Sequence, residues 1–144
     1  MIVADHVYIH GHNFLIVASR FTGWNAIIST PPGKFDGQTL VKILRVFCAT
    51  WIIPEHITTD GGPQMMSGVF QKWLKDWDIK HHPSSAYFPH AHSIAETAVK
   101  TSKRILQDCV SRSGSIDNDR FMRAVLQYCN TPHQDRTDGI RLYP

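Results

Sequence analysis

The sequence lacks the long hydrophobic run that a membrane-spanning helix requires. No apolar stretch among its 144 residues approaches the ~18 residues of a transmembrane segment. The N-terminus carries no basic segment followed by an apolar one, so no secretory signal is predicted. With 42% hydrophobic residues, we expect one globular domain that buries roughly two-thirds of the surface its unfolded chain would expose. A membrane partner is not expected.

Cysteine is also scarce, and its spacing argues against two common kinds of site. The three cysteines, Cys48, Cys109 and Cys129, are widely separated, and no Cys-x-x-Cys pair occurs. Buried thiols in a reducing compartment are therefore favoured over disulfides or a zinc site. The nine histidines form no helical His-x-x-x-His motif and are expected to be ordinary surface or core residues. The formal charge of +3 permits a polyanionic partner without requiring one.

The first part of the chain has the pattern of an antiparallel meander. Residues 2–9, 14–18 and 24–30 are predicted strands, separated by turns that contain Gly11 and Gly23. The second run is continuously apolar, which is typical of a strand buried on both faces.

Helices and short strands then alternate. A helix with Asp36 as its N-cap is predicted, with an apolar face of Leu40, Ile43, Leu44, Phe47 and Trp51. A strand at 56–59 precedes a second helix, whose apolar stripe comprises Met66, Val69, Phe70, Trp73, Leu74 and Trp77. A fifth strand at 79–82 and helices at about 91–112 and 117–128 complete the chain. This order predicts an α/β fold, with a five-stranded mixed sheet flanked by helices.

Three acidic residues lie at positions where a sheet of this kind can carry a functional site. Asp5 lies inside an apolar strand, where a carboxylate is unfavourable unless a positive group compensates it. Asp60 ends the fourth strand, and Glu96 lies near the start of the long helix. Three convergent carboxylates would repel one another unless divalent cations lay between them, and hard oxygen ligands suit Mg²⁺ or Mn²⁺. Singly, each also fits a structural role: a strand-edge residue, a turn former and a first-turn helix acid.

Four blocks of sequence resemble the integrase cores of gypsy-type retrotransposons and retroviruses. Residues 14–24 (FLIVASRFTGW) resemble the family's YLVVVDRFSGW, and residues 53–64 (IPEHITTDGGPQ) resemble GIPE.I.SDNGPQF. Residues 87–96 (YFPHAHSIAE) resemble YHPQSNGQAE, and residues 128–133 (YCNTPH) resemble YRNTPH. The family's catalytic motif is Asp, Asp, then Glu after 35 intervening residues. The chain has 35 residues between its second aspartate and its glutamate.

This resemblance implies a ribonuclease H-like fold and a metal-dependent polynucleotidyl transferase. Asp5, Asp60 and Glu96 would bind two Mg²⁺ or Mn²⁺ ions, which two-metal sites hold about 3.5–4 Å apart. In the family, water first trims the 3′ ends of element DNA, and the new 3′-hydroxyl then attacks target DNA. The implied partner is double-stranded DNA in the nucleus, and a homodimer through the core is expected.

Candidate DNA contacts follow the glutamate. At about 100° per residue, Lys100 and Lys103 share a helical sector with Glu96. Ala98, Val99, Ser102, Leu106 and Cys109 are expected on the other side of the helix, facing the core. The family uses lysines at the positions of Lys100 and Lys103 to contact DNA. A solvated helix face is the alternative. Gln64 matches a family DNA contact, and His92 belongs to the loop at the mouth of the site.

The chain departs from the family at several positions. Gly61 stands where the family has asparagine, Met65 where it has phenylalanine, and His92-Ser93 where it has Asn-Gly. Losing glycine from that loop removes backbone freedom. A domesticated, catalytically weak or inactive core that serves as a DNA-binding or dimerisation module is therefore kept as an alternative. A plain ribonuclease H-type nuclease is disfavoured by the 35-residue spacing. We expect residues 1–144 to be the catalytic core alone, without the family's zinc-binding N-terminal and basic C-terminal domains.

Overall fold

A single five-stranded sheet forms the centre of the protein. The computed structural model describes residues 1–19, 24–30, 35–83 and 93–130. The strand order across the sheet is β3-β2-β1-β4-β5. Its members are β1 (Ile2–Ile9), β2 (His12–Ser19), β3 (Asn25–Ser29), β4 (His56–Thr58) and β5 (Lys80–His82). The first three strands pair antiparallel, whereas β4 runs parallel to β1 and β5 parallel to β4. The predicted mixed sheet is therefore confirmed.

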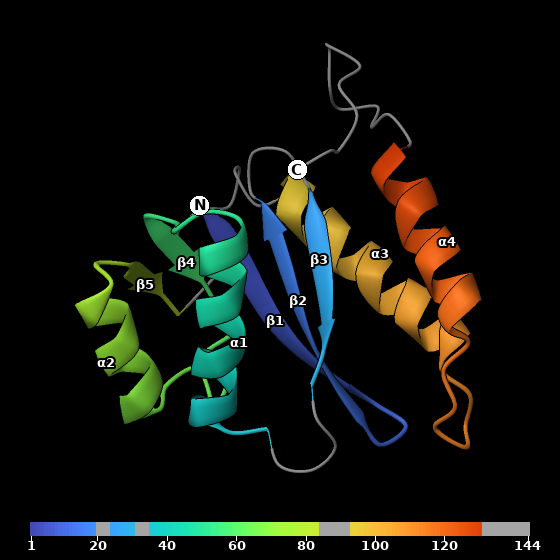
Figure 1. The fold of residues 1–144 in the computed structure, drawn as a ribbon, viewed down its shortest axis with the longest axis horizontal. Helices are drawn as coiled ribbons and strands as arrows, with labels where there is room; N and C mark the ends of the chain where they lie inside the picture. Colours follow the sequence, from blue (N-terminus) through green and yellow to red (C-terminus); the bar gives the residue numbers. More distant parts are fainter. Residues whose placement is uncertain (20–23, 31–34, 84–92, 131–144) are drawn as a thin grey trace.

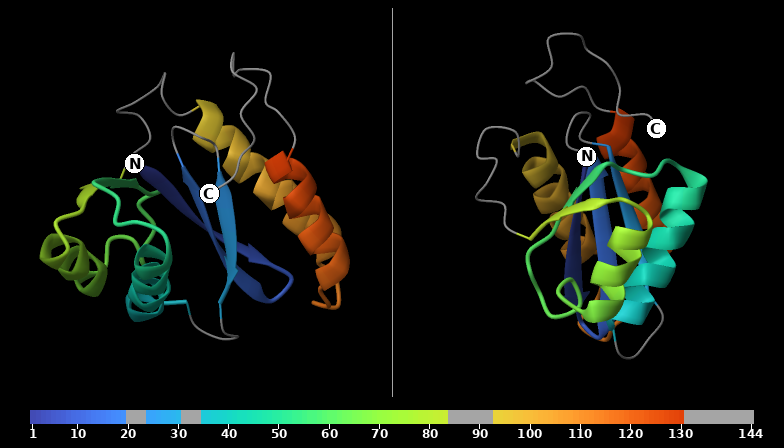
Figure 2. Two further views of the ribbon diagram at one scale, coloured as in Figure 1. Left: turned by 45° about the horizontal axis from the view of Figure 1, so that its top comes forward. Right: turned by 90° about the vertical axis from the view of Figure 1, so that its left-hand side faces the viewer.

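Within the described ranges, four helices cover this sheet. Their bounds are α1 (Gly37–Thr50), α2 (Gly68–Asp76), α3 (Ser93–Cys109) and α4 (Asn118–Asn130). The sheet lies between α1 and α3, as the two views of Figure 2 make clear. In Figure 1, α2 lies beside α1, and α4 runs beside α3. None of the helices in the described ranges is long and apolar enough to cross a membrane.

Alternation along the strands sends side chains into two apolar layers. Ala4, Leu15 and Val17 point toward α1 and α2, where Leu40, Leu44 and Phe70 complete the first layer. The second layer lies against α3 and α4. Its buried members are Ile9, Phe14, Ile16, Ala18, Ala98, Val99, Leu106 and Val110. Because β2 contributes to both layers, its continuously apolar sequence is explained.

Helix α1 begins as predicted. The Oδ1 atom of Asp36 accepts hydrogen bonds from the backbone N–H of Thr39 at 2.9 Å and from its hydroxyl at 2.8 Å, which satisfies a helix-start donor. The prediction that Trp51 lies on the buried helical face was wrong. Trp51 is the C-cap residue, and about half of it remains exposed.

Helix α2 is shorter than its apolar stripe suggested. Ser67 is its N-cap, so Met66 precedes the helix, and both Met66 and Val69 are exposed. Phe70, Trp73 and Leu74 are the residues that α2 buries. The N-termini of α1 and α2 approach closely at Gly37, where an added Cβ would lie 2.1 Å from the Ser67 hydroxyl oxygen. A side chain at position 37 would therefore require Ser67 to shift.

Helix α3 ends three residues before the predicted Arg112. Val110 instead forms an antiparallel bridge with Ile116, and the backbone N–H of Asp117 donates to the carbonyl of Cys109. Residues 91–92, where this helix was expected to begin, lie outside the described ranges. The bridge draws the chain into a tight turn that leads directly into α4.

Candidate active site

Asp5 and Asp60 come from neighbouring parallel strands. Ile2 pairs with Ile57, and Val3 pairs with Thr58. If the same offset continued two residues beyond the end of β4 at Thr58, Asp60 would lie opposite Asp5. Residues paired across adjacent strands project to the same face of a sheet. The cross-strand partner of Asp5 on β2 is Ile16, which is buried in the layer against α3. Asp5 therefore lies on the α3 side of the sheet.

The carboxylate of Asp5 has the positive partner that its apolar surroundings require. The Nζ atom of Lys103 lies 2.8 Å from Oδ2 of Asp5. The Asp5 side chain is 18% exposed, and that of Lys103 is 40% exposed. An ion pair at this depth is partly shielded from water, so it is stronger than a fully exposed pair. The predicted need for compensation at Asp5 is met by a helix that begins almost ninety residues later.

The buried face of α3 holds Lys103 in this position. Its members, as the helical spacing predicted, are Ala98, Val99, Ser102, Leu106 and Cys109. Ser102 is completely buried, and its hydroxyl donates to the carbonyl of Ala98 at 2.7 Å. It also accepts a hydrogen bond from the side-chain amide of Asn25 on β3. This contact ties the middle of α3 to the sheet, one residue from Lys103.

Asp60 lies in a turn at the surface. Its Oδ1 atom accepts the backbone N–H of Gly62 at 3.0 Å, the hydrogen bond of an Asx turn. Gly61 has a φ of +76°, and an added Cβ there would lie 3.2 Å from the carbonyl oxygen of Pro83. Glycine at this position, where the family has asparagine, therefore matches both the backbone conformation and the neighbouring segment. The turn leaves Asp60 exposed.

Glu96 belongs to the first turn of α3, and its side chain lies outside the described part of the structure. Within that described part, no three His, Cys, Asp or Glu side chains are grouped closely enough to hold a metal. The donors that are described nevertheless fit a divalent cation. Asp5 and Asp60 offer hard carboxylate oxygens. Asp5 already holds a cationic group against one of its oxygens.

The candidate DNA-binding residues are not equivalent. Lys100 is exposed on α3, whereas Lys103 is engaged with Asp5. Gln64 is half-buried, and its backbone carbonyl accepts a hydrogen bond from the N-cap hydroxyl of Ser67 at 2.8 Å. His92 lies outside the described residues. Contact of these four residues with DNA stays a prediction.

A hydrogen-bonded histidine beside Asp60 was missed by sequence reasoning. Nε2 of His81 lies 2.7 Å from the hydroxyl of Thr59, and its Nδ1 atom lies 2.9 Å from Nε2 of Gln71. The Gln71 amide donates, so Nδ1 accepts and the ring proton lies on Nε2. Burial, together with the charge of neighbouring His82, lowers the pKa of His81 below its usual value. No signal in the sequence links these residues, because the pairing of β4 with β5 brings them together.

The thiols described are buried and unoxidised, as expected. Cys48 and Cys109 are both free and buried. Burial raises the pKa of the Cys48 thiol to about 11 and also raises the pKa of Cys109. A thiol with a raised pKa is a poor nucleophile and a poor metal ligand near neutral pH. The side chain of Cys129 lies outside the described part of the structure.

The fold is that of a retroviral integrase core. The chain is similar to the crystal structure of the catalytic core domain of BIV integrase, with a TM-score of 0.66 and 15% sequence identity. The similarity covers 94% of this chain and 84% of the BIV chain. The predicted fold class, a ribonuclease H-like mixed sheet flanked by helices, is therefore confirmed.

Two curated proteins are similar in sequence. Over 125 residues, 87% of this chain, it is 30% identical to the uncharacterized protein K02A2.6 of Caenorhabditis elegans. Over 69 residues, 48% of this chain, it is 30% identical to an IgE-binding protein of Mus musculus. The matched regions cover only 10% and 12% of the lengths of those relatives. No family model matches the chain.

Proposed function

We propose that this chain is the catalytic core of a retrotransposon or retroviral integrase, a polynucleotidyl transferase that trims element DNA and joins it to target DNA. The observation that carries the proposal is the parallel pairing of β1 with β4, with Asp5 inside β1 and Asp60 two residues beyond the end of β4. Asp5 lies on the sheet face covered by α3, the helix that carries Glu96. The similarity of the fold to the BIV integrase core and the four sequence blocks support the same assignment.

Asp5, Asp60 and Glu96 are the proposed ligands of two Mg²⁺ or Mn²⁺ ions. Such ions, when bound, activate the attacking oxygen and stabilise the leaving oxygen of an in-line displacement. The protein's part is to hold the ligands rigidly. Asp5 is fixed within a strand that pairs on both sides. Asp60 is fixed by its hydrogen bond to the backbone N–H of Gly62, and α3 is anchored to β3 by Asn25 and Ser102.

Double-stranded DNA is the proposed substrate, and it would cross the end of the sheet beside α3. The exposed outer surface of this helix carries Lys100 and Arg104, which are suited to contact phosphates along a DNA backbone. Gln64 and His92 are proposed to contact DNA nearer the scissile phosphate. Because chromosomal DNA is the expected target, we propose that the protein acts in the nucleus.

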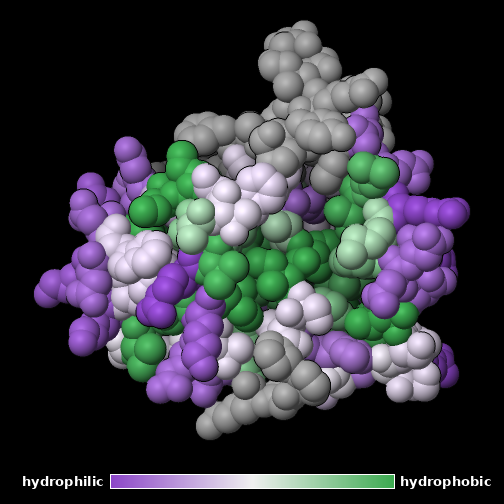
Figure 3. Space-filling view, in the orientation of Figure 1, coloured by the Kyte–Doolittle hydropathy of each residue, from purple (hydrophilic) through white to green (hydrophobic). Residues whose placement is uncertain are grey.

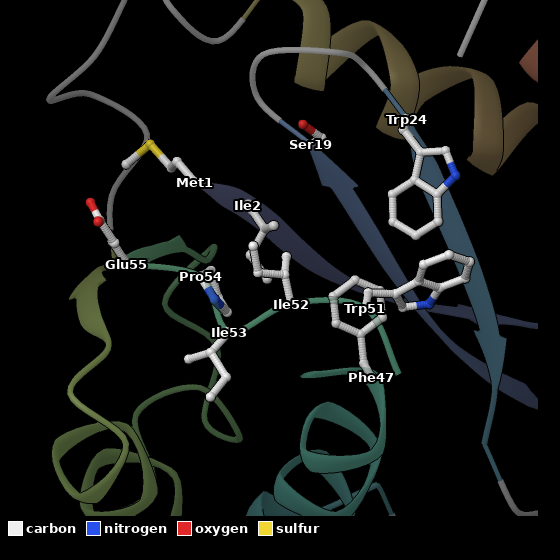
Figure 4. Close-up of a pocket in the computed structure, with 10 residues that line it drawn as sticks. All are labelled: Met1, Ile2, Ser19, Trp24, Phe47, Trp51, Ile52, Ile53, Pro54 and Glu55. Atoms are coloured by element: carbon white, nitrogen blue, oxygen red, sulfur yellow. The ribbon is translucent and has the colours of Figure 1, made fainter. Parts of the chain in front are cut away.

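A homodimer is proposed through an apolar surface formed by α1 and the edge strand β3. Hydrophobic residues gather there in Figure 3. A pocket of about 530 Å³ lies at its upper end, where the rings of Trp24 and Trp51 meet with centroids 4.9 Å apart (Figure 4). Val46, Ile52 and Ile53 are all exposed nearby. Exposed apolar residues clustered in this way favour an interface with another protein surface, and self-association is the simplest such interface.

Strand-transfer reversal on a branched DNA substrate tests the enzymatic proposal. We expect weak joining that Mn²⁺ stimulates and that Asp60→Asn abolishes. Asp76→Asn, which removes an exposed carboxylate at the end of α2, is the matched control and should leave the rate unchanged. His92→Asn combined with Ser93→Gly restores the family's loop. It should raise the rate by about tenfold to a hundredfold, equivalent to about 1.4–2.7 kcal/mol of barrier.

Product formation by gel and Mn²⁺ affinity would both be measured for the wild type and the three variants. A restored loop that binds Mn²⁺ normally yet stays as inert as Asp60→Asn would refute the enzymatic proposal. The chain would then be a DNA-binding or dimerisation module. Cleavage of an RNA–DNA hybrid in place of DNA joining would indicate a ribonuclease H-type nuclease.

A further inference from the structure

The ion pair between Asp5 and Lys103 occupies a carboxylate oxygen that the proposed function assigns to metal binding. Lys103 Nζ lies 2.8 Å from Oδ2 of Asp5, a hydrogen-bonding distance for a charged pair. A carboxylate oxygen that accepts a close ammonium N–H has its lone pairs directed at that proton. A divalent cation at the same oxygen would also place two positive centres within contact distance of each other. The two cations therefore compete for Asp5.

Lys103 differs in this respect from the other cations on its helix. Its neighbour in sequence, Ser102, is completely buried and hydrogen-bonded to Asn25, so the Lys103 stem leaves α3 close to the sheet. Lys100 and Arg104 are exposed instead. Among the described side chains of α3, Lys103 alone combines contact with a carboxylate and partial exposure, 40%. Lys103 is thus placed to neutralise Asp5 and also to turn its side chain toward solvent.

We infer that Lys103 is an exchangeable counterion, which Asp5 holds until a divalent cation binds and displaces it. The inference rests on the proposed function in taking Asp5 as a metal ligand. Displacement moves no covalent bond: the ammonium group keeps its charge and changes its partner from a carboxylate to water or a DNA phosphate. Metal binding and the phosphate contact of Lys103 are then coupled. By linkage, each strengthens the other by the same factor.

Mn²⁺ binding to the DNA-free protein, followed by the electron paramagnetic resonance signal of free Mn²⁺, tests the exchange. Removing the competitor in Lys103→Met should tighten Mn²⁺ binding about twofold to fivefold, the range expected for losing a pair of this exposure. Lys103→Gln should also tighten Mn²⁺ binding. Because it leaves a neutral N–H donor for Asp5, this variant replaces Lys103→Met if the methionine variant folds poorly. Lys103→Arg keeps the positive charge and should not tighten binding.

Arg104→Met is the matched control, because it removes one positive charge from the adjacent exposed position. Measured at about 0.15 M salt, where the Debye length is about 8 Å, it should leave Mn²⁺ affinity close to that of the wild type. Equal Mn²⁺ affinity in the two Lys103 neutral variants and Arg104→Met would overturn the inference. It would mean that Lys103 and the metal do not compete.

The salt dependence of duplex DNA binding tests whether Lys103, once the metal has displaced it from Asp5, contacts a DNA phosphate. With Mn²⁺ present, Lys103→Met should reduce the slope of log K against log salt by about 0.9 relative to the wild type, the value for one phosphate contact. With EDTA in place of Mn²⁺, the two proteins should have the same slope, because Asp5 retains Lys103. A difference of the same size in both conditions would show that Lys103 contacts DNA independently of metal, and would contradict the coupling.

Failure of this inference is distinguishable from failure of the proposed function. If the wild type binds Mn²⁺ and Asp60→Asn does not, while neutral Lys103 variants bind like the wild type, only the exchange is refuted. If neither the wild type nor any Lys103 variant binds Mn²⁺, the metal site itself is refuted, and the exchange falls with it.

Discussion

The side-chain amide of Asn25 donates a hydrogen bond to the hydroxyl of Ser102, which joins β3 at the edge of the sheet to the middle of α3. Both residues are buried, and 76 residues separate them in the sequence. The same hydroxyl donates to the carbonyl of Ala98, so its donor and acceptor functions are both used. This bond sets the position of α3 along the sheet and therefore the position of Lys103 relative to Asp5.

Removing that hydroxyl should destabilise the protein. Ser102→Ala deprives the buried Asn25 amide of this acceptor, which costs about 1–3 kcal/mol in the free energy of unfolding. Urea denaturation followed by tryptophan fluorescence measures the change. Ser113→Ala removes an exposed hydroxyl and should change the free energy by less than about 0.5 kcal/mol. Equal stability of the two variants would show that the buried bond contributes nothing beyond a surface contact.

Acid should destabilise the protein partly through His81. Its pKa is lowered in the folded protein by burial and by His82, whereas the unfolded chain has a pKa of about 6.5. Between the two pKa values the unfolded chain binds more protons, so the free energy of unfolding falls as the pH drops below about 6.5. Above that pH the contribution is fully present. Protonation of Nδ1 would also break the hydrogen bond from Gln71.

His81→Gln removes this titration while keeping a side chain that can hydrogen-bond. The difference in unfolding free energy between pH 7.5 and pH 5.5 should therefore be smaller in His81→Gln than in the wild type. His10→Asn changes an exposed histidine in a turn and serves as the control. If the variants and the wild type lose the same stability on acidification, His81 does not account for the pH dependence.

Lys100 should contribute one phosphate contact to DNA binding. Lys100→Ala is expected to weaken binding about equally for all sequences and to reduce the salt slope of log K by about 0.9. Lys72→Ala removes an exposed lysine from α2, on the opposite side of the sheet, and should leave the slope unchanged. Fluorescence anisotropy with a labelled duplex over a salt series gives both slopes. An unchanged slope for Lys100→Ala would indicate that Lys100 belongs to an ordinary solvated helix face and does not contact DNA.

The apolar surface of α1 and β3 should mediate self-association. Val46→Asp introduces a charge in the middle of the exposed part of α1 and should shift the protein toward monomer by at least about tenfold in dissociation constant, because an unpaired charge in an apolar interface is strongly unfavourable. Sedimentation velocity over a concentration series measures the shift. Lys75→Asp places an aspartate at an exposed position of α2, changes the charge by −2 compared with −1 for Val46→Asp, and should not change the association.

Local pattern was sufficient for the order of the strands and helices and for the buried face of α3. A helical period places Ala98, Ser102 and Leu106 on one side whatever they pack against, and they are all buried. The same reasoning was wrong for Met66 and Val69. They continue an apolar stripe, but the N-cap at Ser67 and the position of α2 at the end of the sheet leave them exposed. Periodicity identifies a face of a helix, whereas the neighbouring elements determine how much of that face is covered.

The order of the elements, the cap at Asp36 and the spacing from Asp60 to Glu96 could be predicted from the sequence, because each depends on residues close together in the chain. The position of Asp5 in an apolar strand also predicted that it needs a positive partner. The identity of that partner, Lys103, follows from the tertiary packing. The parallel pairing of β1 with β4 and the seating of α3 on the sheet are set by packing between distant segments. Ion pairs and register follow from that packing, and no local pattern encodes them.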